Sequence, residues 1–237
     1  RLRDQFVDSV LRSEAAKKSA FEVGKDVMEY LQVVASEPSD SSIRSSLDSF
    51  WSAWHDLSVD AGSASARAQV MERGRSLVDM FKIDALSLDL ESSLDASVRR
   101  VNLVSERLVG LNVEIARAIA RQEPASDLLD QRDVLLDELT ELTGATVSHL
   151  SDGNSVRVSV DGFPLVDRDQ RYDIEVRYHP GGTEFRWVSA PGEYTVMPSV
   201  GGKIGGYKEA RDAMVQDFKS EVESLFKAVV DDINAIH

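Results

Sequence analysis

The segment 63–122 constrains the fold more than any other part of the chain, because it has helical patterning and contains no proline. If unbroken, a helix of this length would extend over roughly 90 Å at 1.5 Å per residue. From residue 94 onward the apolar residues follow a heptad spacing, which is typical of helices that pack lengthwise. The first heptad position is occupied by Leu94, Val101, Leu108 and Ile115, and the second by Val104, Leu111 and Ala118. This pattern predicts an antiparallel bundle of long, coiled-coil-like helices.

Another long helix is predicted over residues 1–36, and Pro38 lies in the segment that ends it. Charged side chains such as Glu14 and Lys17 lie away from its apolar face, so the helix is amphipathic. The residues near that face are Phe6, Val10, Phe21, Met28, Leu31 and Val34.

The next predicted helix covers residues 42–58, with Ser41 or Ser42 at its start. Apolar side chains follow the spacing of a buried stripe in this helix. The stripe comprises Leu47, Phe50, Trp51, Trp54 and Leu57. A stacking platform for bases or sugars is the alternative for Trp51 and Trp54, but it needs basic or planar polar neighbours, and the neighbours here are Ser, Ala and Asp.

A short helix over residues 126–142 follows, with Ser126 or Asp127 as the expected cap and Gly144 as the stop. Its apolar stripe comprises Leu128, Leu129, Leu135, Leu136, Leu139 and Leu142. Asp130, Asp133 and Asp137 fall on one face, with Arg132 beside them. A cation site is one interpretation of this face. A solvated acidic face is the preferred one, because helical carboxylates without a loop rarely converge on a metal.

Residues 145–200 have a different pattern, in which β-branched and aromatic residues alternate with polar ones. The turn signals are Asp152-Gly153, Asp161-Gly162, Gly181-Gly182 and Pro191-Gly192. Together they predict a small module of four to six antiparallel strands. The glycine cluster 201–206 lacks the spacing of a phosphate-binding loop, so it is interpreted as a flexible lead into a final helix that extends to His237.

The predicted fold is therefore mainly α with a small β module: an elongated antiparallel helical bundle with a β-hairpin region. Residues 1–144 form a helical rod, with helices at about 1–36, 42–58, 63–122 and 126–142. Residues 145–200 form the β module, and residues 201–237 form a return helix that packs on the rod.

Charge and composition narrow the possible functions. The chain has 27 basic and 41 acidic residues, giving a net charge of −14, which disfavours nucleic acid and anionic membrane surfaces as partners. The chain has no cysteine, and its four histidines lie far apart in sequence, which argues against disulfides, thiol catalysis and a zinc site. No membrane-spanning apolar run and no cleavable leader is visible. Because the helical pattern is already under way at Arg1, without a start methionine, we expect the sequence to be part of a longer protein.

No recognisable catalytic arrangement appears in the sequence. The motifs G-x-S-x-G and H-E-x-x-H are absent, and no catalytic Cys-His pair is possible. The segment 167–173 faintly resembles a calcium loop, but Arg171 stands where an oxygen ligand belongs. A glycosidase needs two carboxylates on either side of the bond that it cleaves. Because the chain has 41 acidic residues, many such pairs could be chosen, so their presence is no evidence for this activity. We therefore expect no enzyme activity, no cofactor and no bound metal.

Several segments resemble the flagellar hook-associated proteins of the FlgK type. The matching segments are Arg3-Asp4-Gln5-Phe6, Glu37-Pro38-Ser39-Asp40, the aromatic run 50–57, the run 127–133, Gly202-Lys203-Ile204-Gly205-Gly206, Arg211-Asp212 and Asn234-Ala235-Ile236-His237. The resemblance covers nearly the whole chain, and the run 127–133 is its closest part.

This resemblance implies a structural role at the junction between the flagellar hook and filament. Proteins of this type are exported through the flagellar type III apparatus, without a cleaved signal, and they act outside the cell. The implied partners are further copies in the axial lattice, the hook protein and the second hook-filament junction protein. An export chaperone is implied only for terminal segments that this sequence lacks.

Two interpretations of residues 126–133 remain open. As an interface hypothesis, Asp127, Asp130, Arg132 and Asp133, with the sides of the 63–122 helix, contact neighbouring subunits or the hook protein. The alternative is a local cap and salt-bridge cluster that fixes the helix start. At the level of function, one rival is the ligand-sensing ectodomain of a bacterial receptor. The other is a wall-active or glycan-cleaving enzyme, for which residues 145–200 offer little room.

Overall fold

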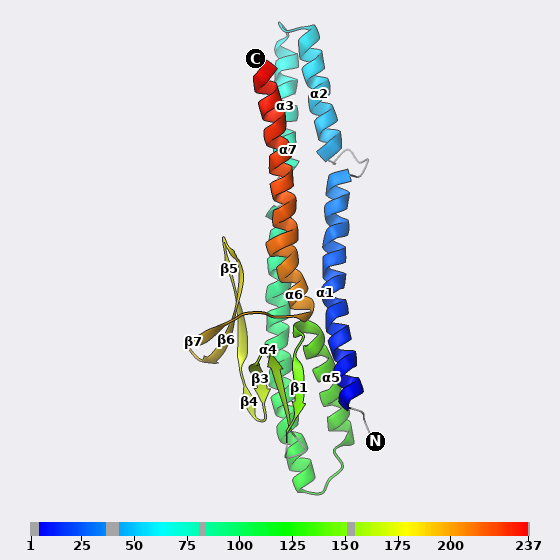
Figure 1. Cartoon of the computed structure of the whole chain (residues 1–237), viewed down its shortest axis with the longest axis vertical. Helices are drawn as coiled ribbons and strands as arrows, with labels where there is room; N and C mark the ends of the chain where they lie inside the picture. The colour runs from blue at the N-terminus through cyan, green and yellow to red at the C-terminus, as the bar shows by residue number, and fades with distance from the viewer. Residues whose placement is uncertain (1–4, 37–42, 81–83, 151–154, 237) are drawn as a thin grey trace. The chain divides into compact units, whose positions relative to one another are not determined.

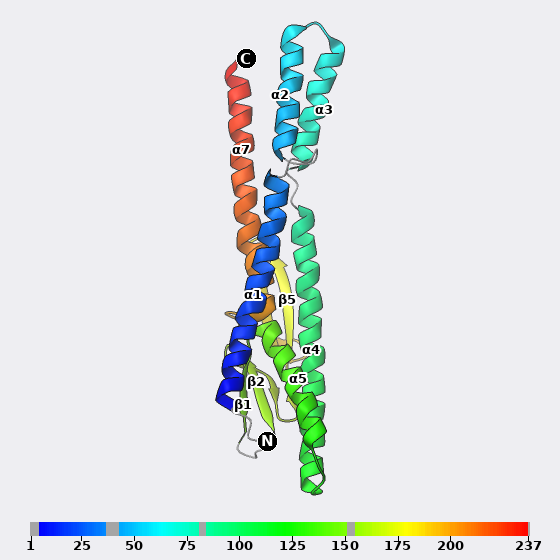
Figure 2. The same cartoon turned by 90° about the vertical axis from the view of Figure 1, so that its right-hand side faces the viewer.

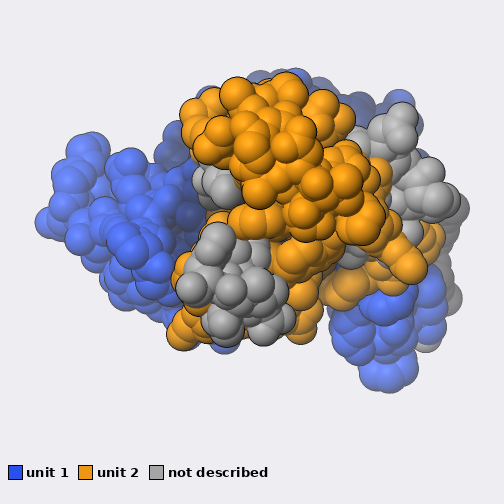
Figure 3. Space-filling model, turned by 90° about the horizontal axis from the view of Figure 1, so that it is seen from above, with its two compact units in different colours: residues 1–24, 90–212 blue, residues 25–89, 213–237 orange. Residues whose placement is uncertain are grey.

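The computed structural model describes residues 5–36, 43–80, 84–150 and 155–236, which divide into two compact units (Figures 1 and 3). Unit 1 combines residues 1–24 with 90–212, and unit 2 combines 25–89 with 213–237. Both units thus bring together segments that are distant in sequence. The predicted division into 1–144, 145–200 and 201–237 follows local patterning alone, and it stays a prediction.

Helices account for most of the described residues. They are α1 (Gln5–Ser36), α2 (Ile43–Val59), α3 (Ala64–Met80), α4 (Asp84–Ala120), α5 (Ser126–Thr143), α6 (Gly202–Glu209) and α7 (Val215–Ile236), and a π-helical turn, η1 (Ala210–Met214), joins α6 to α7. With two small antiparallel sheets, this composition confirms the predicted class, mainly α with a small β module. The predicted return helix is therefore interrupted by one π-turn.

The segment 63–122, which was predicted to form a single helix, contains two described helices, α3 and α4. One ends at Met80 and the next begins at Asp84. Apolar spacing continues across this point, so periodicity alone did not reveal the boundary. Residue Ile83, the proline-containing segment 37–40, the expected helix start at 41–42 and the Asp152-Gly153 turn lie outside the described residues.

The described part of the β region contains seven strands, one more than the upper limit of the prediction. They are β1 (Thr146–His149), β2 (Val156–Val160), β3 (Phe163–Asp167), β4 (Gln170–Arg171), β5 (Asp173–His179), β6 (Gly182–Ala190) and β7 (Glu193–Met197). They form two antiparallel sheets, ordered β1-β2-β3-β4 and β5-β6-β7. Asp161 and Gly162 both have positive φ, 50° and 86°, as the predicted hairpin turn between β2 and β3 requires.

The core of unit 1 lies between α4, α5, α6 and the two sheets. The predicted heptad of α4 supplies much of it, since Leu94, Val101, Leu108 and Ile115 are each 0% exposed. Across from them, α5 contributes Leu136 and Leu139, and the strands contribute residues such as Val158 and Phe185. The first heptad position is confirmed as buried, and so are Val104 and Ala118 of the second, whereas Leu111 is only half-buried.

Two asparagines of α4 attach one sheet each through its backbone. The Asn102 amide donates to the Ile174 carbonyl at 2.9 Å, and the Ile174 N–H donates back to Asn102 at 2.9 Å. Asn112, which is 2% exposed, donates to the carbonyls of Val156 at 3.2 Å and Arg168 at 2.9 Å. An apolar core side chain could not form hydrogen bonds with these backbone groups. The asparagine contacts therefore fix where β2 and β5 lie along α4.

The buried residues of α1 agree with the prediction at Leu31, which is 3% exposed, but differ from it at most other positions. Phe6 and Phe21 are both 74% exposed, and Val10 and Met28 are also exposed. Within unit 1 the buried residues of α1 are Arg12, Ala16, Ser19 and Val23. Near Ala20 this face meets α6 closely, because a methyl group on Gly206 would lie 2.7 Å from the Ala20 carbonyl oxygen. Farther along, the same face buries Arg12, which donates to Asp137 of α5.

The glycine cluster at 201–206 is therefore a packing device rather than a flexible lead. Gly202, Ile204 and Gly206 are buried within α6. Gly202 has φ +58°, and a Cβ there would meet the Glu141 carbonyl oxygen and lie 2.7 Å from the carbonyl carbon of Leu142. Glycine is required at this position by both the backbone angle and the space.

In unit 2, α2 and α3 pack side by side (Figures 1 and 2). Phe50 is buried, as predicted, and its ring meets Trp51 and Trp54 edge-on with centroids 5.6 and 6.4 Å away. The assignment of Trp51 to the buried stripe was wrong, because it is 41% exposed. The described buried residues of α2 are Phe50 and Ala53, which lie about 60° apart around the helix axis.

Candidate functional site

The predicted interface residues all lie on α5 but do not share one environment. Asp127 and Asp130 are exposed, Asp133 is half-buried, and Arg132 is only 4% exposed. Asp127 and Asp130 therefore lie where a partner could contact them. Arg132 does not, because its guanidinium lies 3.4 Å from the Asn112 side chain, inside unit 1.

Asp133 belongs to an ion-pair cluster between α1 and α5. The Arg12 guanidinium donates to Asp137 at 2.7 Å and lies 3.8 Å from Asp133. Farther along, the Ser19 hydroxyl donates to Glu141 at 2.8 Å. The acidic face that could have suggested a cation site thus receives an arginine from a neighbouring helix. No set of three or more His, Asp or Glu side chains in the described ranges could hold a metal ion.

The helix start differs from the prediction, and the helix end agrees with it. Ala125 holds the cap position of α5 without a side-chain hydrogen bond, so neither Ser126 nor Asp127 is the cap. Both already lie in the first helical turn, where the negative charge of Asp127 suits the helix dipole. Gly144 ends the helix with φ 68°, and its N–H donates to the Thr140 carbonyl at 2.7 Å.

A groove of about 560 Å³ lies beside the exposed face of α5, between α5 and α4. It is lined by Arg107, Gly110, Leu111, Glu114, Gln131, Val134 and Leu135. Val134 is 66% exposed although it is apolar, and Gly110 leaves space because no atom approaches its missing side chain within 4 Å. An apolar floor with charged residues at the rim is a common form of protein-binding surface.

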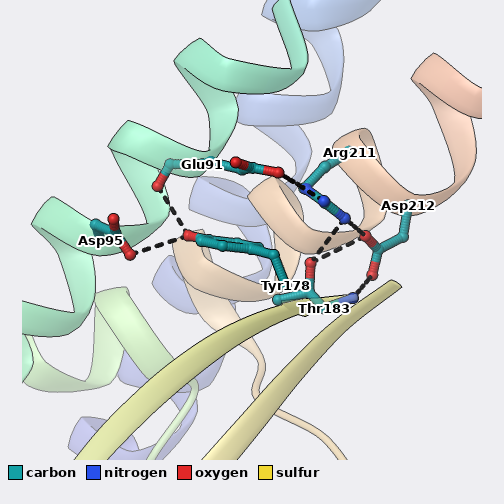
Figure 4. A network of polar contacts seen from close by, with 6 residues as sticks. All are labelled: Glu91, Asp95, Tyr178, Thr183, Arg211 and Asp212. Atoms are coloured by element: carbon teal, nitrogen blue, oxygen red, sulfur yellow. Dashed lines mark hydrogen bonds and ion pairs between the residues drawn. The ribbon is translucent and has the colours of Figure 1, made fainter. Parts of the chain in front are cut away.

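A second polar cluster joins η1 to α4 and to the β5–β6 hairpin, all within unit 1 (Figure 4). Arg211 donates from Nε and Nη2 to Glu91 Oε1, at 2.9 and 2.6 Å. Asp212 accepts from the Thr183 N–H at 2.8 Å and from the Thr183 hydroxyl at 2.9 Å. Arg211 also donates to Asp212 at 2.7 Å, which links the two sets of contacts.

Tyr178 completes this cluster from β5. Its hydroxyl donates to the Glu91 carbonyl at 2.9 Å and to Asp95 at 3.0 Å, and the Arg211 guanidinium lies 5.0 Å from its ring centroid (Figure 4). Burial, followed by the hydrogen bond to Asp95, raises the pKa of Tyr178 above its ordinary value. The hydroxyl therefore remains a neutral donor.

The charges of the cluster stabilise one another despite burial. Burial alone would raise the pKa of Asp212, but the hydrogen bonds from Thr183, Arg211 and Lys208 outweigh it and lower that pKa. Burial alone would likewise lower the pKa of Arg211, and its bonds to Glu91 and Asp212 raise it instead. The pair stays ionised, and the cluster holds elements in place. The hydrophobic periodicity of the sequence did not indicate that Arg211 and Asp212 lie in a polar cluster. They were noted only because the Arg211-Asp212 pair resembles the family's sequences.

Two acidic residues of the segment 167–173, which faintly resembles a calcium loop, are paired with arginines. Asp167 accepts from Arg157 at 2.6 Å, and Asp173 accepts from Arg171 at 3.3 Å.

No helix within the described ranges is long and apolar enough to cross a membrane.

Comparisons with known proteins converge on one family. Residues 28–237 match the family model "Flagellar hook-associated protein FlgK helical domain". Flagellar hook-associated protein 1 of Bacillus subtilis is 29% identical over 172 residues, which cover 70% of this chain and 34% of that protein. The Salmonella typhimurium protein of the same name is 26% identical over 248 residues, covering 99% of this chain and 44% of its own length. The chain thus spans less than half the length of these relatives.

A solved structure shares the fold. The flagellar hook junction protein FlgK from Burkholderia pseudomallei aligns with a TM-score of 0.69 and 22% identity, over 86% of this chain and 39% of that protein. The comparisons give no support to the receptor ectodomain that was the alternative prediction.

Proposed function

The chain belongs to the FlgK family of flagellar hook-associated proteins, and from this we propose that it forms part of the adapter between the flagellar hook and filament. The match of residues 28–237 to the family's helical domain carries the proposal. Relatives are named as flagellar hook-associated proteins, so the role proposed is structural and needs no catalytic residue.

The proposed location is the exported flagellum, outside the cell. The proposed partners are identical copies in the axial lattice, the hook protein and the second hook-filament junction protein.

Within unit 1, two distinct surfaces support contact with neighbouring copies. The first is the exposed apolar surface of α1, formed by Phe6, Val7, Val10, Leu11 and Phe21. The second is the groove between α4 and α5, with Asp127 and Asp130 on the adjacent face of α5. Open helical assemblies form when one surface of a subunit binds a different surface of the next. We propose that the α1 surface of one copy binds the α4–α5 groove of its neighbour.

The four residues of the interface hypothesis take different parts in this proposal. Asp127 and Asp130 contact the neighbouring copy or the hook protein. Arg132 and Asp133 act inside the subunit, where their contacts with Asn112 and Arg12 hold α5 in position. Leu108 and Ile115, in contrast, lie in the core, so substituting them would test folding and not assembly.

The proposal is tested in a flagellated strain that lacks its own first hook-filament junction protein. This chain is expressed there with its native flanking sequences, and filaments are scored by electron microscopy and swimming. Restored filaments are expected. Bare hooks despite normal export of the protein would contradict the junction role.

Interface variants are then compared in the same strain. The α1 variant carries Phe6→Gln and Leu11→Gln, and the groove variant carries Val134→Arg. The matched control is Leu88→Gln, an exposed apolar residue of unit 2. We expect both interface variants to be exported and folded but to lose filaments, while the control assembles. If the interface variants also assemble normally, the junction role stands and the assigned surfaces are wrong.

A further inference from the structure

Gly110 leaves a notch in the groove between α4 and α5 that no contact inside the subunit requires. It lies within α4, and no described atom lies within 4 Å of the position that its side chain would take. Alanine would therefore fit there, and a glycine inside a helix is destabilising relative to alanine. The notch lies in the same groove as Val134, an apolar residue that is itself exposed. Such a glycine is expected where another molecule approaches the helix closely.

Two charged side chains follow Gly110 on the same face of α4. Glu114 and Arg117 lie four and seven residues after the glycine, so both lie within about 40° of it around the helix axis. Both are exposed. Toward its end, this face of α4 therefore presents the notch, then an acidic side chain and then a basic one.

The exposed surface of α1 carries the complementary series in the reverse direction. Phe21 is 74% exposed, Lys17 precedes it by four residues, and Glu14 precedes it by seven. The side chains of Lys17 and Glu14 are 70% and 64% exposed, and they form an ion pair with each other at 2.8 Å. The spacing of four and seven residues is the same in both helices. A large apolar side chain thus corresponds to the notch, a basic one to Glu114 and an acidic one to Arg117.

We infer that α1 of one copy lies antiparallel to α4 of its neighbour, with Phe21 in the notch at Gly110. The inference rests on the proposed contact between the α1 surface and the α4–α5 groove, and it adds the direction and the register of that contact. In this register each charged side chain faces one of opposite sign. The facing pairs are Lys17 with Glu114 and Glu14 with Arg117.

The parallel direction is less favourable at the same notch. With Phe21 again placed at Gly110, a parallel α1 would bring Lys18 against Arg107, because each lies three residues before its contact residue. Like charges at this spacing are destabilising. The charge pattern therefore selects the antiparallel direction.

The antiparallel direction also gives neighbouring copies the same polarity. Inside one copy, Arg12 of α1 binds Asp137 of α5, and Ser19, farther along α1, binds Glu141, farther along α5. These two helices therefore run in the same direction. The short segment 121–125 joins α4 to α5 as a hairpin, so α4 runs opposite to both (Figure 2). A neighbour whose α1 is antiparallel to this α4 has the same direction as the first copy, as subunits related by rotation about one axis must have.

Charge reversal tests the register in the strain that lacks its own junction protein. The chain is expressed with its native flanking sequences, and the fraction of hooks that carry filaments is counted. The α1 reversal combines Glu14→Lys with Lys17→Glu, and the α4 reversal combines Glu114→Lys with Arg117→Glu. Both reversals keep the net charge, and the first also keeps the ion pair within α1.

Each reversal alone should lose filaments, because like charges then face each other across the contact, and the two together should regain them. The matched control reverses an exposed ion pair of β5, with Glu175→Arg and Arg177→Glu, and should assemble like the parent. Normal assembly of both single reversals would overturn the register. A combination that assembles no better than either reversal alone would overturn it as well.

Filling the notch is the second test. Gly110→Leu should leave the Tm of the purified protein equal or higher, because no atom meets a Cβ there, and yet it should lose filaments. Ala116→Leu places the same side chain at an exposed position about 120° away around α4 and should assemble. A parent chain that restores no filaments would contradict the junction role itself. A parent and a Gly110→Leu variant that assemble equally well would overturn the inferred contact and leave the junction role standing.

Discussion

The contact between α6 and α1 predicts opposite effects for the same substitution at two glycines. A methyl group on Gly206 would lie 2.7 Å from the Ala20 carbonyl oxygen and 2.9 Å from the Ala20 Cα. Both atoms belong to the backbone, so the helices must move apart. Overpacking of this kind costs about 1–3 kcal/mol. Replacing a helical glycine by alanine returns about 1 kcal/mol, so Gly206→Ala should destabilise by up to about 2 kcal/mol in net terms.

Gly110 is the matched control, because it lies inside α4 and nothing approaches its missing side chain within 4 Å. Gly110→Ala should therefore gain only the propensity term and stabilise by about 0.5–1 kcal/mol. For a chain of this length, 1 kcal/mol corresponds to about 2–4 °C in Tm. Thermal denaturation followed by circular dichroism should separate the two variants by about 1–12 °C, with the parent between them. Shifts of the same sign in both variants would refute the direct backbone contact.

Other contacts yield shorter predictions. Asn102→Ala leaves the Ile174 N–H and carbonyl without their side-chain partner and should cost about 2–3 kcal/mol in urea denaturation, whereas Asn102→Asp retains the acceptor and should cost less. The pKa of Asp212 is lowered in the folded state, so its contribution is present above its unfolded pKa, about 3.9, and is lost as the pH falls through the lower folded value. The stability difference between the parent and Asp212→Asn should therefore shrink below about pH 4, and a constant difference would contradict this assignment. Burial, then the charges of Arg132 and Arg12, lower the pKa of His149, so its NMR titration midpoint should fall below the ordinary value of about 6.5. Because the unfolded chain then takes up the proton first, His149 should reduce stability as the pH falls through this range, and His149→Gln should remove that part of the pH dependence.

Features that depend on local pattern were predictable from the sequence. The heptad of α4 placed Leu94, Val101, Leu108 and Ile115 correctly in the core, because a seven-residue repeat can bury only one seam of a helix. The Asp161-Gly162 turn was predictable because its two positive φ angles demand such residues. The Gly144 helix stop follows the same logic, since it adopts the left-handed conformation.

Features set by a distant partner were not predictable in this way. Nothing near Arg132 in sequence indicates that Asn112 lies beside it, so a residue expected at an interface is buried. In the π-turn, Arg211 donates to Glu91 and Thr183, which are far from it in sequence. Local helical periodicity is the same whether or not such partners exist. The glycines of α6 could have been recognised as packing positions only with α1 and α5 in view.

The N-terminal part of α1 has a buried face and an exposed apolar one. Gly206 brings the backbone of α6 against Ala20, and the buried residues nearby include the small Ala16 and Ser19. Phe6, Leu11 and Phe21 lie on the surface of unit 1. An exposed apolar surface of this kind is a liability for an isolated subunit and an advantage for one that is covered by a neighbour. The exposed apolar side chains of α1 thus favour the proposed lattice contact through this helix.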